Sequence, residues 1–419
     1  MSDFSFANKL AVSSLLPRLE TGMADPINIG FLGPLSGPVQ TWGRPGLLGC
    51  ELWVEWINRA GGLLLGGRRY PVQIQAYDCR YDADRARQGA RDLVLNKNVR
   101  LLLMLGGDSL SLIKPFLSKH RVLTTTLLPS DLTPDTPYLI APSELHPLYV
   151  VTGVQWAAQR YPQERRVALC SQIDGLGDPS LAAYRAAFGA QGMPIVKDIR
   201  YDPLNASPTD MVEAMLAEKP DILCWCTSHT PMVHAMTEHA FHRGFKGRII
   251  SCTLDGYQSL IEKTSQEFMN GTIFQFPDFD DPLLADKDFF FRHPQEFYDE
   301  YCKRFPNEWS AVSWEYVAAL DIWLSALEKA QSLSAVSVLA AMKQMHGVQH
   351  AFGRAEWWGD DMYGISNALV GDWPVVQVQN SKAKIVEFAS ISDWLDQHGD
   401  RFKAELSSLG QLWEQRLTK

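Results

Sequence analysis

The sequence lacks the signatures of several large classes of protein. No apolar run reaches the ~18 residues of a membrane-spanning helix, so we expect no membrane span. The chain carries 39 Lys and Arg against 48 Asp and Glu and has no basic block, which argues against a nucleic-acid partner. The Gly-x-Ser-x-Gly, His-Glu-x-x-His and Gly-x-x-x-x-Gly-Lys-Ser/Thr motifs are also absent. We therefore predict that the protein is not an enzyme.

Cysteine and histidine are present, but in patterns that do not indicate a metal site. The seven cysteines contain no Cys-x-x-Cys pair, so they define neither a disulfide framework nor a zinc signature. Four histidines lie close together, but the first three are five residues apart, which does not align them on one helix face, and only the last two are three residues apart. They are His229, His234, His239 and His242. We interpret this segment as a partly exposed helix, and we expect no metal and no cofactor.

The first 26 residues have a composition unlike that of the rest of the chain. A short apolar run, residues 10–16, follows Lys9, and Gly22-Met23-Ala24 comes shortly after it. Pro17, Arg18 and Glu20 interrupt the region, which makes it a poor export signal. We interpret residues 1–26 as a leader or a disordered tail.

Strands and helices alternate from Ile27 onwards. A strand that begins at Ile27 runs into the turn Gly33-Pro34-Leu35-Ser36-Gly37-Pro38, and a helix over residues 42–60 follows. Further strands are predicted over residues 72–78, 100–105 and 122–127, with helices between them. Repetition at intervals of about 30 residues predicts right-handed crossovers and a parallel sheet.

A second α/β set begins near residue 146. Strands are predicted at 166–171, 194–200, 221–226 and 248–252, with helices between them. Helices at 294–304, 310–330 and 334–345 come next, followed by a Trp- and Gly-rich turn region at 352–361, a hairpin at 375–388 and a helix at 394–417. At 419 residues two domains are expected. We predict an α/β fold with one lobe from residues 27–145 plus 277–350 and another from 146–276 plus 351–419.

Candidate site residues follow from a rule for parallel sheets. Ligands bind beyond the carboxyl ends of the strands, and the segments that follow five predicted strands are therefore candidates. These segments contain Trp42, Gly107-Asp108-Ser109, Leu128 and Ser130, His229, and Thr253 to Asp255. Free N–H groups and a hydroxyl at Gly107 to Ser109 suit a carboxylate or carbonyl oxygen, although a plain helix cap by Asp108 or Ser109 explains the same residues equally well. An aromatic side chain with backbone donors is typical of a small-molecule pocket.

The same residues resemble a known family. The run from Ile27 to Pro38 with Trp42-Gly43, Ile57-Asn58-x-x-Gly61-Gly62, and Asp82-Ala83-Asp84-Arg85-Ala86 resembles type I periplasmic binding proteins, of the leucine/isoleucine/valine-binding branch that serves ABC importers. The resemblance covers residues 27–390. It implies two Rossmann-like lobes with parallel sheets, a hinge of several segments and a ligand clamped between the lobes.

The resemblance also implies roles for individual residues. It makes Trp42 the aromatic lid, and it makes the Gly107, Asp108, Ser109, Leu128 and Ser130 region the donors to the ligand. Second-lobe contacts are implied at Leu176, Ser228, His229, Thr253 and Asp255, and Tyr316 matches an aromatic residue near the hinge. Relatives that bind amino acids have hydroxyl residues where this chain has Gly107-Asp108, and an Asp facing a carboxylate is repulsive.

Two functions are compatible with the sequence. The first is a periplasmic protein that binds an amino acid, amide, urea or aromatic acid and delivers it to an ABC permease. The second is a cytosolic ligand sensor of the amide-responsive type, which relays occupancy to a regulatory protein; the poor export signal favours it. In both cases we expect Trp42→Ala and Ser109→Ala to weaken ligand binding.

Overall fold

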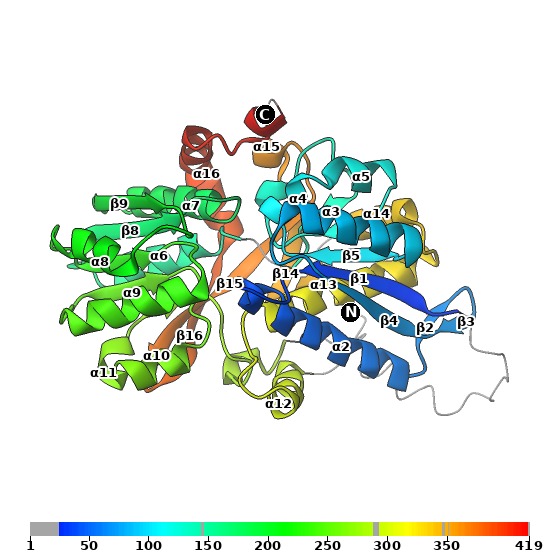
Figure 1. The fold of residues 1–419 in the computed structure, drawn as a ribbon, viewed down its shortest axis with the longest axis horizontal. Coiled ribbons are helices and arrows are strands. Elements are labelled where there is room, and N and C mark those ends of the chain that lie inside the picture. Colours follow the sequence, from blue (N-terminus) through cyan, green and yellow to red (C-terminus); the bar gives the residue numbers. More distant parts are fainter. Residues whose placement is uncertain (1–24, 144–145, 288–292, 346–347, 351, 418–419) are drawn as a thin grey trace.

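The structure, a computed structural model, describes residues 25–143, 146–287, 293–345, 348–350 and 352–417. Most of the segment interpreted from the sequence as a leader or tail lies outside these residues. The chain folds into two α/β lobes, each with its own central sheet (Figure 1). This is the fold class expected from the sequence.

The first lobe is built on a five-stranded sheet with the order β4-β1-β5-β6-β7. All neighbours in it are parallel. The strands are β1 (Ile27–Gly33), β4 (Val72–Asp78), β5 (Leu101–Met104), β6 (Thr124–Thr125) and β7 (Leu139–Ile140). Helices α2 (Arg44–Arg59) and α3 (Ala83–Arg91) lie on opposite faces of this sheet (Figure 1). A side-chain cap starts α3, because Asp82 accepts a hydrogen bond from the Arg85 N–H at 2.8 Å.

The remaining elements of the first lobe are short, except for one long helix. The short ones are the hairpin β2 (Leu63–Leu65) and β3 (Arg68–Tyr70), the 3-10 turns η2 (Gln40–Trp42) and η4 (Pro129–Asp131), the π-helical turn Asp92–Asn96, and helices α4 (Asp108–Ser111) and α5 (Lys114–Lys119). The buried helix α13 (Val312–Ala330) packs against α2 and is followed by α14 (Ala335–Lys343). Thus a segment far along the chain completes the first lobe.

The second lobe is built on a nine-stranded sheet with the order β13-β14-β15-β12-β11-β10-β8-β9, to which β16 adds beside β15. Its parallel part consists of β8 (Val167–Gln172), β9 (Ile195–Tyr201), β10 (Ile222–Trp225), β11 (Arg248–Ser251) and β12 (Ile273–Phe274). Its antiparallel part consists of β13 (Val348–His350), β14 (Gly353–Trp358), β15 (Ala368–Gln379) and β16 (Lys382–Ser390).

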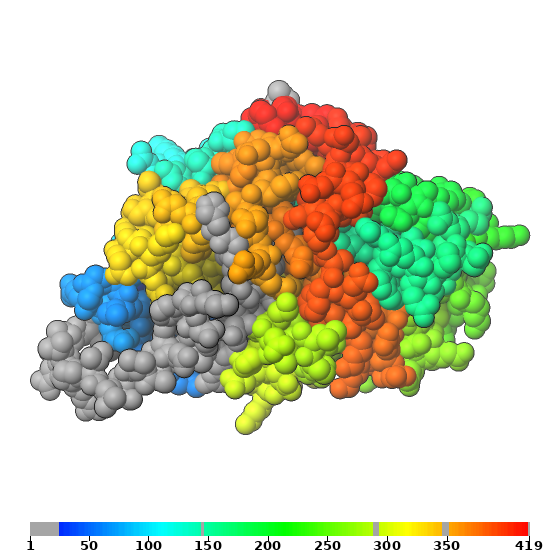
Figure 2. Space-filling view, turned by 180° about the vertical axis from the view of Figure 1, so that it is seen from behind, coloured from blue at the N-terminus to red at the C-terminus, as the bar shows by residue number. Residues whose placement is uncertain are grey.

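Helices cover the second sheet and join the lobes. They are α6 (Val150–Arg160), α7 (Gly177–Ala190), α8 (Pro208–Leu216), α9 (Thr230–His242), α10 (Tyr257–Lys263), α11 (Gln266–Met269), η5 (Pro282–Leu284), α15 (Asp360–Tyr363), α16 (Ile391–Ser408) and α17 (Trp413–Leu417). Helix α12 (Pro294–Arg304) instead packs on α2 of the first lobe, where Phe297 contacts Trp56 and Arg304 bonds Glu55. Seen from behind, the orange-to-red C-terminal segment lies between the yellow helices of the first lobe and the green second lobe (Figure 2).

Strand β15 links the two sheets physically. At its start Ala368 bridges to Ala141, which directly follows β7 of the first sheet. Further along, Val376 and Gln377 pair with β12 in the second sheet. Because one strand is hydrogen-bonded to both lobes, bending at β15 can change the angle between them.

Two predictions for the C-terminal region are wrong. The Trp- and Gly-rich segment predicted as a turn contains strand β14, which pairs with β15 from Ala355 to Trp358. Its glycines suggested a turn, but pairing with β15 in the sheet decides the conformation. The helix predicted over 394–417 breaks into α16 and α17, because Gly410 adopts a φ of 67° that ends the first helix.

Candidate ligand-binding site

A cavity of about 30 Å³ lies between the two lobes, near the carboxyl ends of strands from both sheets. A volume of this size holds about two water molecules, so a larger ligand can enter only when the lobes move apart. The lining side chains are mostly apolar and come from both lobes: Trp42, Leu105, Leu127, Leu128, His146, Tyr149, Leu176, Thr227, Thr253, Phe276, Ala311, Val312 and Glu315. A ligand here would touch both lobes at once.

Trp42 forms one wall of this cavity and is held in place by its backbone and its ring. Tyr316 donates from its hydroxyl to the Trp42 carbonyl at 3.2 Å, and the indole Nε1 donates to Asp255 Oδ2 at 3.2 Å. The position after Trp42 needs glycine, because a Cβ at Gly43 would lie 2.2 Å from the carbonyl oxygen of Pro34. The His229 ring meets Trp42 edge-on, with centroids 5.6 Å apart. The loop after β1 therefore delivers an aromatic wall.

Several contacts join the lobes around Trp42. Thr41 and Thr230 place their hydroxyl oxygens 3.0 Å apart, and Asp108 Oδ1 accepts a hydrogen bond from the Gly175 N–H at 3.2 Å. The Trp42–Asp255 bond also crosses from one lobe to the other. Asp255 is half-buried, and desolvation raises the pKa of its carboxyl group against the opposing effect of its hydrogen bonds. These contacts describe a closed arrangement of the lobes.

A buried polar network forms the floor of the cavity on the second-lobe side. His146 Nε2 lies 3.2 Å from the Leu176 carbonyl oxygen, and His146 Nδ1 lies 3.0 Å from the Tyr149 hydroxyl. A carbonyl only accepts, so Nε2 carries the proton and Nδ1 accepts from Tyr149. Burial lowers the pKa of His146 to about 4, and the imidazole is therefore neutral at pH 7. Thr227 and Cys252 complete the network, with oxygen and sulfur 3.3 Å apart.

The predicted donors at the ends of β5 and β6 make hydrogen bonds inside the protein. The Gly107 N–H donates to the carboxylate of Asp131, at 3.1 and 3.3 Å from its two oxygens. The Ser109 hydroxyl donates to the Gly106 carbonyl at 2.8 Å. The Leu128 N–H donates to Thr126 Oγ1 at 3.1 Å. Each group thus has a partner within its own lobe.

The structure brings seven of the twelve predicted site residues to the cavity or to its Trp42 wall. Trp42, Leu128, Leu176 and Thr253 line the cavity, while His229, Asp255 and Tyr316 contact Trp42. The other five do not line it. Gly107, Asp108 and Ser109 form the loop that faces Gly175, Ser130 is buried and accepts from Arg416 through its carbonyl, and Ser228 is buried behind the cavity.

Several lining residues were not predicted from the sequence. Leu105 and Thr227 follow β5 and β10 closely, so the strand-end rule applied consistently would have selected them. Glu315 is 1% exposed near the start of α13, and an acid surrounded by apolar residues in such a helix is a signal for a special environment. His146, Tyr149 and Phe276 lie in the segments that cross between the lobes and have no comparable signal.

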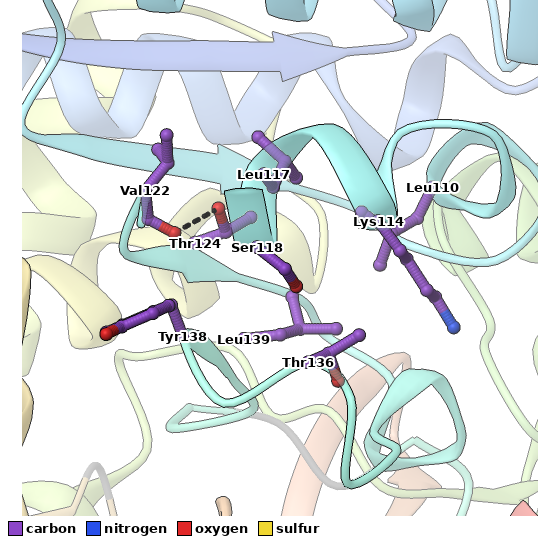
Figure 3. Close-up of a pocket in the computed structure, with 9 residues that line it drawn as sticks. All are labelled: Leu110, Lys114, Leu117, Ser118, Val122, Thr124, Thr136, Tyr138 and Leu139. Atoms are coloured by element: carbon purple, nitrogen blue, oxygen red, sulfur yellow. Dashed lines mark hydrogen bonds between the residues drawn. The ribbon is translucent and has the colours of Figure 1, made fainter. Parts of the chain in front are cut away.

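A second hollow lies inside the first lobe, between α5 and the strands β6 and β7 (Figure 3). Its walls include Leu110, Leu117 and Leu139, while the Lys114 side chain points away from them (Figure 3). Lys114 Nζ donates to the backbone carbonyl of Asp131 at 2.7 Å. With no second-lobe residue in its lining, this hollow would not respond to movement of the lobes.

Within the described ranges, no three or more His, Cys, Asp or Glu side chains are grouped as a metal site would require. His234 Nε2 instead lies 2.8 Å from the Asp255 carbonyl oxygen, and His239 Nε2 lies 2.7 Å from Glu213. For the part of the chain that the structure describes, no helix has the length and apolarity that crossing a membrane requires.

Comparisons with known proteins agree with this architecture. Residues 26–384 match the family described as periplasmic binding protein. A search of curated proteins finds no match. Among solved structures, a leucine-binding protein from Thermotoga maritima is 16% identical to this chain with a TM-score of 0.68. The match covers 88% of this chain and 99% of the Thermotoga maritima chain.

Two further solved structures have a similar fold. A solute-binding protein of an ABC transporter from Rhodopseudomonas palustris HaA2, in complex with p-hydroxybenzoic acid, is 17% identical with a TM-score of 0.72, covering 88% of this chain and 98% of its own. An ABC transporter substrate-binding protein from Sphaerobacter thermophilus is 18% identical with a TM-score of 0.69, covering 87% of this chain and 98% of its own. At these identities the similarity establishes the fold.

Proposed function

The chain belongs to the periplasmic binding protein family, and from this membership we propose that it captures one small molecule between its lobes and delivers it to an ABC importer. The resemblance found in the sequence is thereby confirmed at the level of the family. In this proposal the protein works in the periplasm, performs no catalysis, and has an ABC permease as its partner.

The cavity shared by the two lobes is the observation that carries this proposal. Trp42 and Leu128 reach it from the first lobe, and Leu176 and Thr253 reach it from the second. A ligand that contacts both lobes stabilises the closed arrangement over the open one, and occupancy can thus be reported to a partner as a change of shape. A largely apolar pocket with few polar groups is typical of small-molecule binding.

The proposal divides the chain into two ligand-binding lobes. We assign residues 27–145 and 277–350 to one lobe and residues 146–276 and 351–419 to the other. The pairing of β15 with β12, and of its first residue with Ala141, supports a hinge in which several segments run side by side. The ligand is drawn from amino acids, amides, ureas and aromatic acids.

A thermal-shift screen over these four classes, combined with small-angle scattering, tests the proposed function. A ligand at 100 times its Kd adds about 2.7 kcal/mol to the free energy of unfolding. We expect at least one compound to raise Tm and to reduce the radius of gyration as the lobes close. A protein that binds none of the compounds, or binds them without any change in shape, would contradict the proposal.

Trp42→Ala tests the placement of the pocket. The substitution removes an aromatic wall and the Trp42–Asp255 bond, and we expect the Kd of any hit to rise at least about tenfold, or about 1.4 kcal/mol. Trp156→Ala is the matched control, because Trp156 is a half-buried indole on α6 that packs against Tyr161 and does not line the cavity. Equal affinities in the two variants would refute the placement.

A cytosolic ligand sensor that acts on a regulatory protein is the second candidate function. All seven cysteines are free thiols, six of them buried, which is the usual state in a reducing compartment. Cell fractionation separates the two candidates. Protein recovered from the periplasm contradicts the sensor, and protein confined to the cytoplasm contradicts the importer.

A further inference from the structure

One carboxylate of the second lobe reaches the start of a long helix in the first lobe. Asp255 lies in the loop between β11 and α10, and its Oδ1 accepts a hydrogen bond from the Ala311 N–H at 3.4 Å. Ala311 immediately precedes α13 and has no side-chain group that could cap this helix. The first N–H groups of a helix lack partners within it, and the helix dipole favours a negative charge there. A side chain from the opposite lobe thus serves as the cap.

The other oxygen of the same carboxylate orients the Trp42 indole. Asp255 Oδ2 accepts from Trp42 Nε1 at 3.2 Å, and Trp42 and Ala311 both line the cavity. Tyr316, on α13, also donates to the Trp42 carbonyl. The bonds from Ala311 and Trp42 are the largest effects that offset the desolvation of Asp255 and lower its pKa again. Asp255 therefore joins two parts of the first-lobe wall from the second lobe.

Asp255 is itself held in place within the second lobe. His234 Nε2, on α9, lies 2.8 Å from the Asp255 carbonyl oxygen, and a carbonyl only accepts, so the imidazole donates. Gly256 then takes a φ of 68°, in the left-handed region, and α10 begins directly after it. The carboxylate therefore projects towards the first lobe from a backbone that is fixed on its own lobe.

We propose that Asp255 is an interlobe latch, which caps α13 and holds the Trp42 indole from the opposite lobe and thereby favours the closed arrangement before a ligand is bound. In this role Asp255 is a positioning residue, and it is not the ligand contact that the sequence predicted. Because the latch acts on the closure of the same two lobes, it rests on the proposed function. Its action does not depend on the chemistry of the ligand.

The populations of open and closed protein without ligand test the latch. Spin labels are attached through Leu112→Cys in the first lobe and Leu204→Cys in the second, because these side chains are 52% and 87% exposed. Cys302→Ser removes the one native cysteine that is not buried. Double electron–electron resonance between the labels then gives the ratio of closed to open protein.

We expect this labelled protein to have a closed population without ligand, and we expect Asp255→Ala to lower the closed-to-open ratio at least about tenfold. The substitution removes two hydrogen bonds to a charged oxygen, each of which is stronger than a bond between neutral groups. A protein that is entirely open without ligand overturns the proposal, as does an equal ratio in Asp255→Ala.

Asp221→Ala is the matched control. Asp221 is also half-buried and accepts from two N–H groups, those of Arg165 and Arg166, at 2.9 and 2.8 Å. All three of these residues belong to the second lobe, so we expect Asp221→Ala to lower Tm and to leave the closed-to-open ratio unchanged. A ratio that falls as far as in Asp255→Ala would mean that lost stability alone opens the lobes, and it would overturn the latch.

Trp42→Phe keeps Asp255 and therefore gives a test that does not depend on the folding of Asp255→Ala. Phenylalanine retains an aromatic ring but lacks the Nε1 donor. We expect the closed-to-open ratio to fall, by less than in Asp255→Ala because the Ala311 bond remains. In the double variant Trp42→Phe should lower the ratio no further, since the partner of Nε1 is already gone. An unchanged ratio in Trp42→Phe, or effects that simply add, contradict the latch.

Failure of the latch can be distinguished from failure of the proposed function. Equal ratios in the unaltered protein and Asp255→Ala remove the latch, and the proposed function stands if a compound of the thermal-shift screen still reduces the radius of gyration. A protein that binds none of those compounds contradicts the proposed function, whatever its closed-to-open ratio.

Discussion

Acidification from pH 6.5 to 4 is expected to destabilise the protein through His146. This histidine is 4% exposed and lies beside the cavity, bonded to Tyr149 and to the Leu176 carbonyl. Burial lowers its pKa from 6.5 to about 4, so the unfolded chain binds a proton in this window before the folded chain does. The stabilising contribution is therefore fully present above pH 6.5 and is lost as the pH falls through about 4.

The size of the effect follows from the two pKa values. At about 1.4 kcal/mol for each tenfold change in proton affinity, the difference between 6.5 and about 4 corresponds to about 3 kcal/mol. At a pH of about 5.2, midway between the values, the unfolded histidine is almost fully protonated and the folded one almost fully neutral, so unfolding takes up about 0.9 proton at this site. The neighbouring Cys252 thiol does not contribute, because burial raises its pKa to about 12.

Calorimetric unfolding in buffers with different ionisation enthalpies measures this proton uptake. We expect the wild-type protein to take up about 0.9 proton more than His146→Gln at a pH of about 5.2. Glutamine retains an N–H that can donate to the Leu176 carbonyl. His120→Gln is the control, since His120 is exposed at the end of α5. Equal proton uptake by the wild type and His146→Gln would refute the reasoning.

Two further predictions concern packing and loop geometry. Ser109→Ala should lower the free energy of unfolding by about 1 kcal/mol, and by more than Ser111→Ala does. Both hydroxyls donate to a carbonyl three residues earlier, but only Ser109 is buried. Equal losses of stability in urea unfolding would contradict this prediction. Gly49→Ala should destabilise the protein by about 1–3 kcal/mol despite the better helix propensity of alanine, since its Cβ would lie 2.1 Å from the Ser313 carbonyl oxygen. Gly399→Ala is the matched helical control, with its nearest atom at 3.8 Å, and should show a neutral or higher Tm.

The alternation of strands and helices was readable from the sequence because the strands of a parallel sheet are buried on both faces. The predicted strand at Val72–Asp78 agrees with β4 residue for residue, and those at 166–171 and 248–252 agree with β8 and β11 to within a residue at each end. The buried runs of β8 and β11 have few other conformations in which they are fully buried. Strand β4 is a half-buried edge strand, and its alternation of apolar and polar residues identified it instead. Strands that depend on a distant partner, such as β14 with β15, carry no such local signal.

The candidate site could be predicted in part for a related reason. Trp42, Leu128 and Thr253 were selected because they follow strands, and the strand-end rule depends only on topology. His146 and Phe276 were missed because they lie in the segments that cross between the lobes, where position relative to a strand says nothing about the cavity. Their role depends on how the lobes are packed together.

The sequence by itself therefore determined the two α/β lobes, the family and the strand-end loops that carry the Trp42 wall. Local propensity and the period of apolar residues encode these features. Tertiary structure alone decided the partners of the polar groups. Gly107 and Asp131 are 24 residues apart, and only the folded loops show that the carboxylate of one takes the N–H of the other. A donor read from sequence is available to a ligand only if the fold has not already used it.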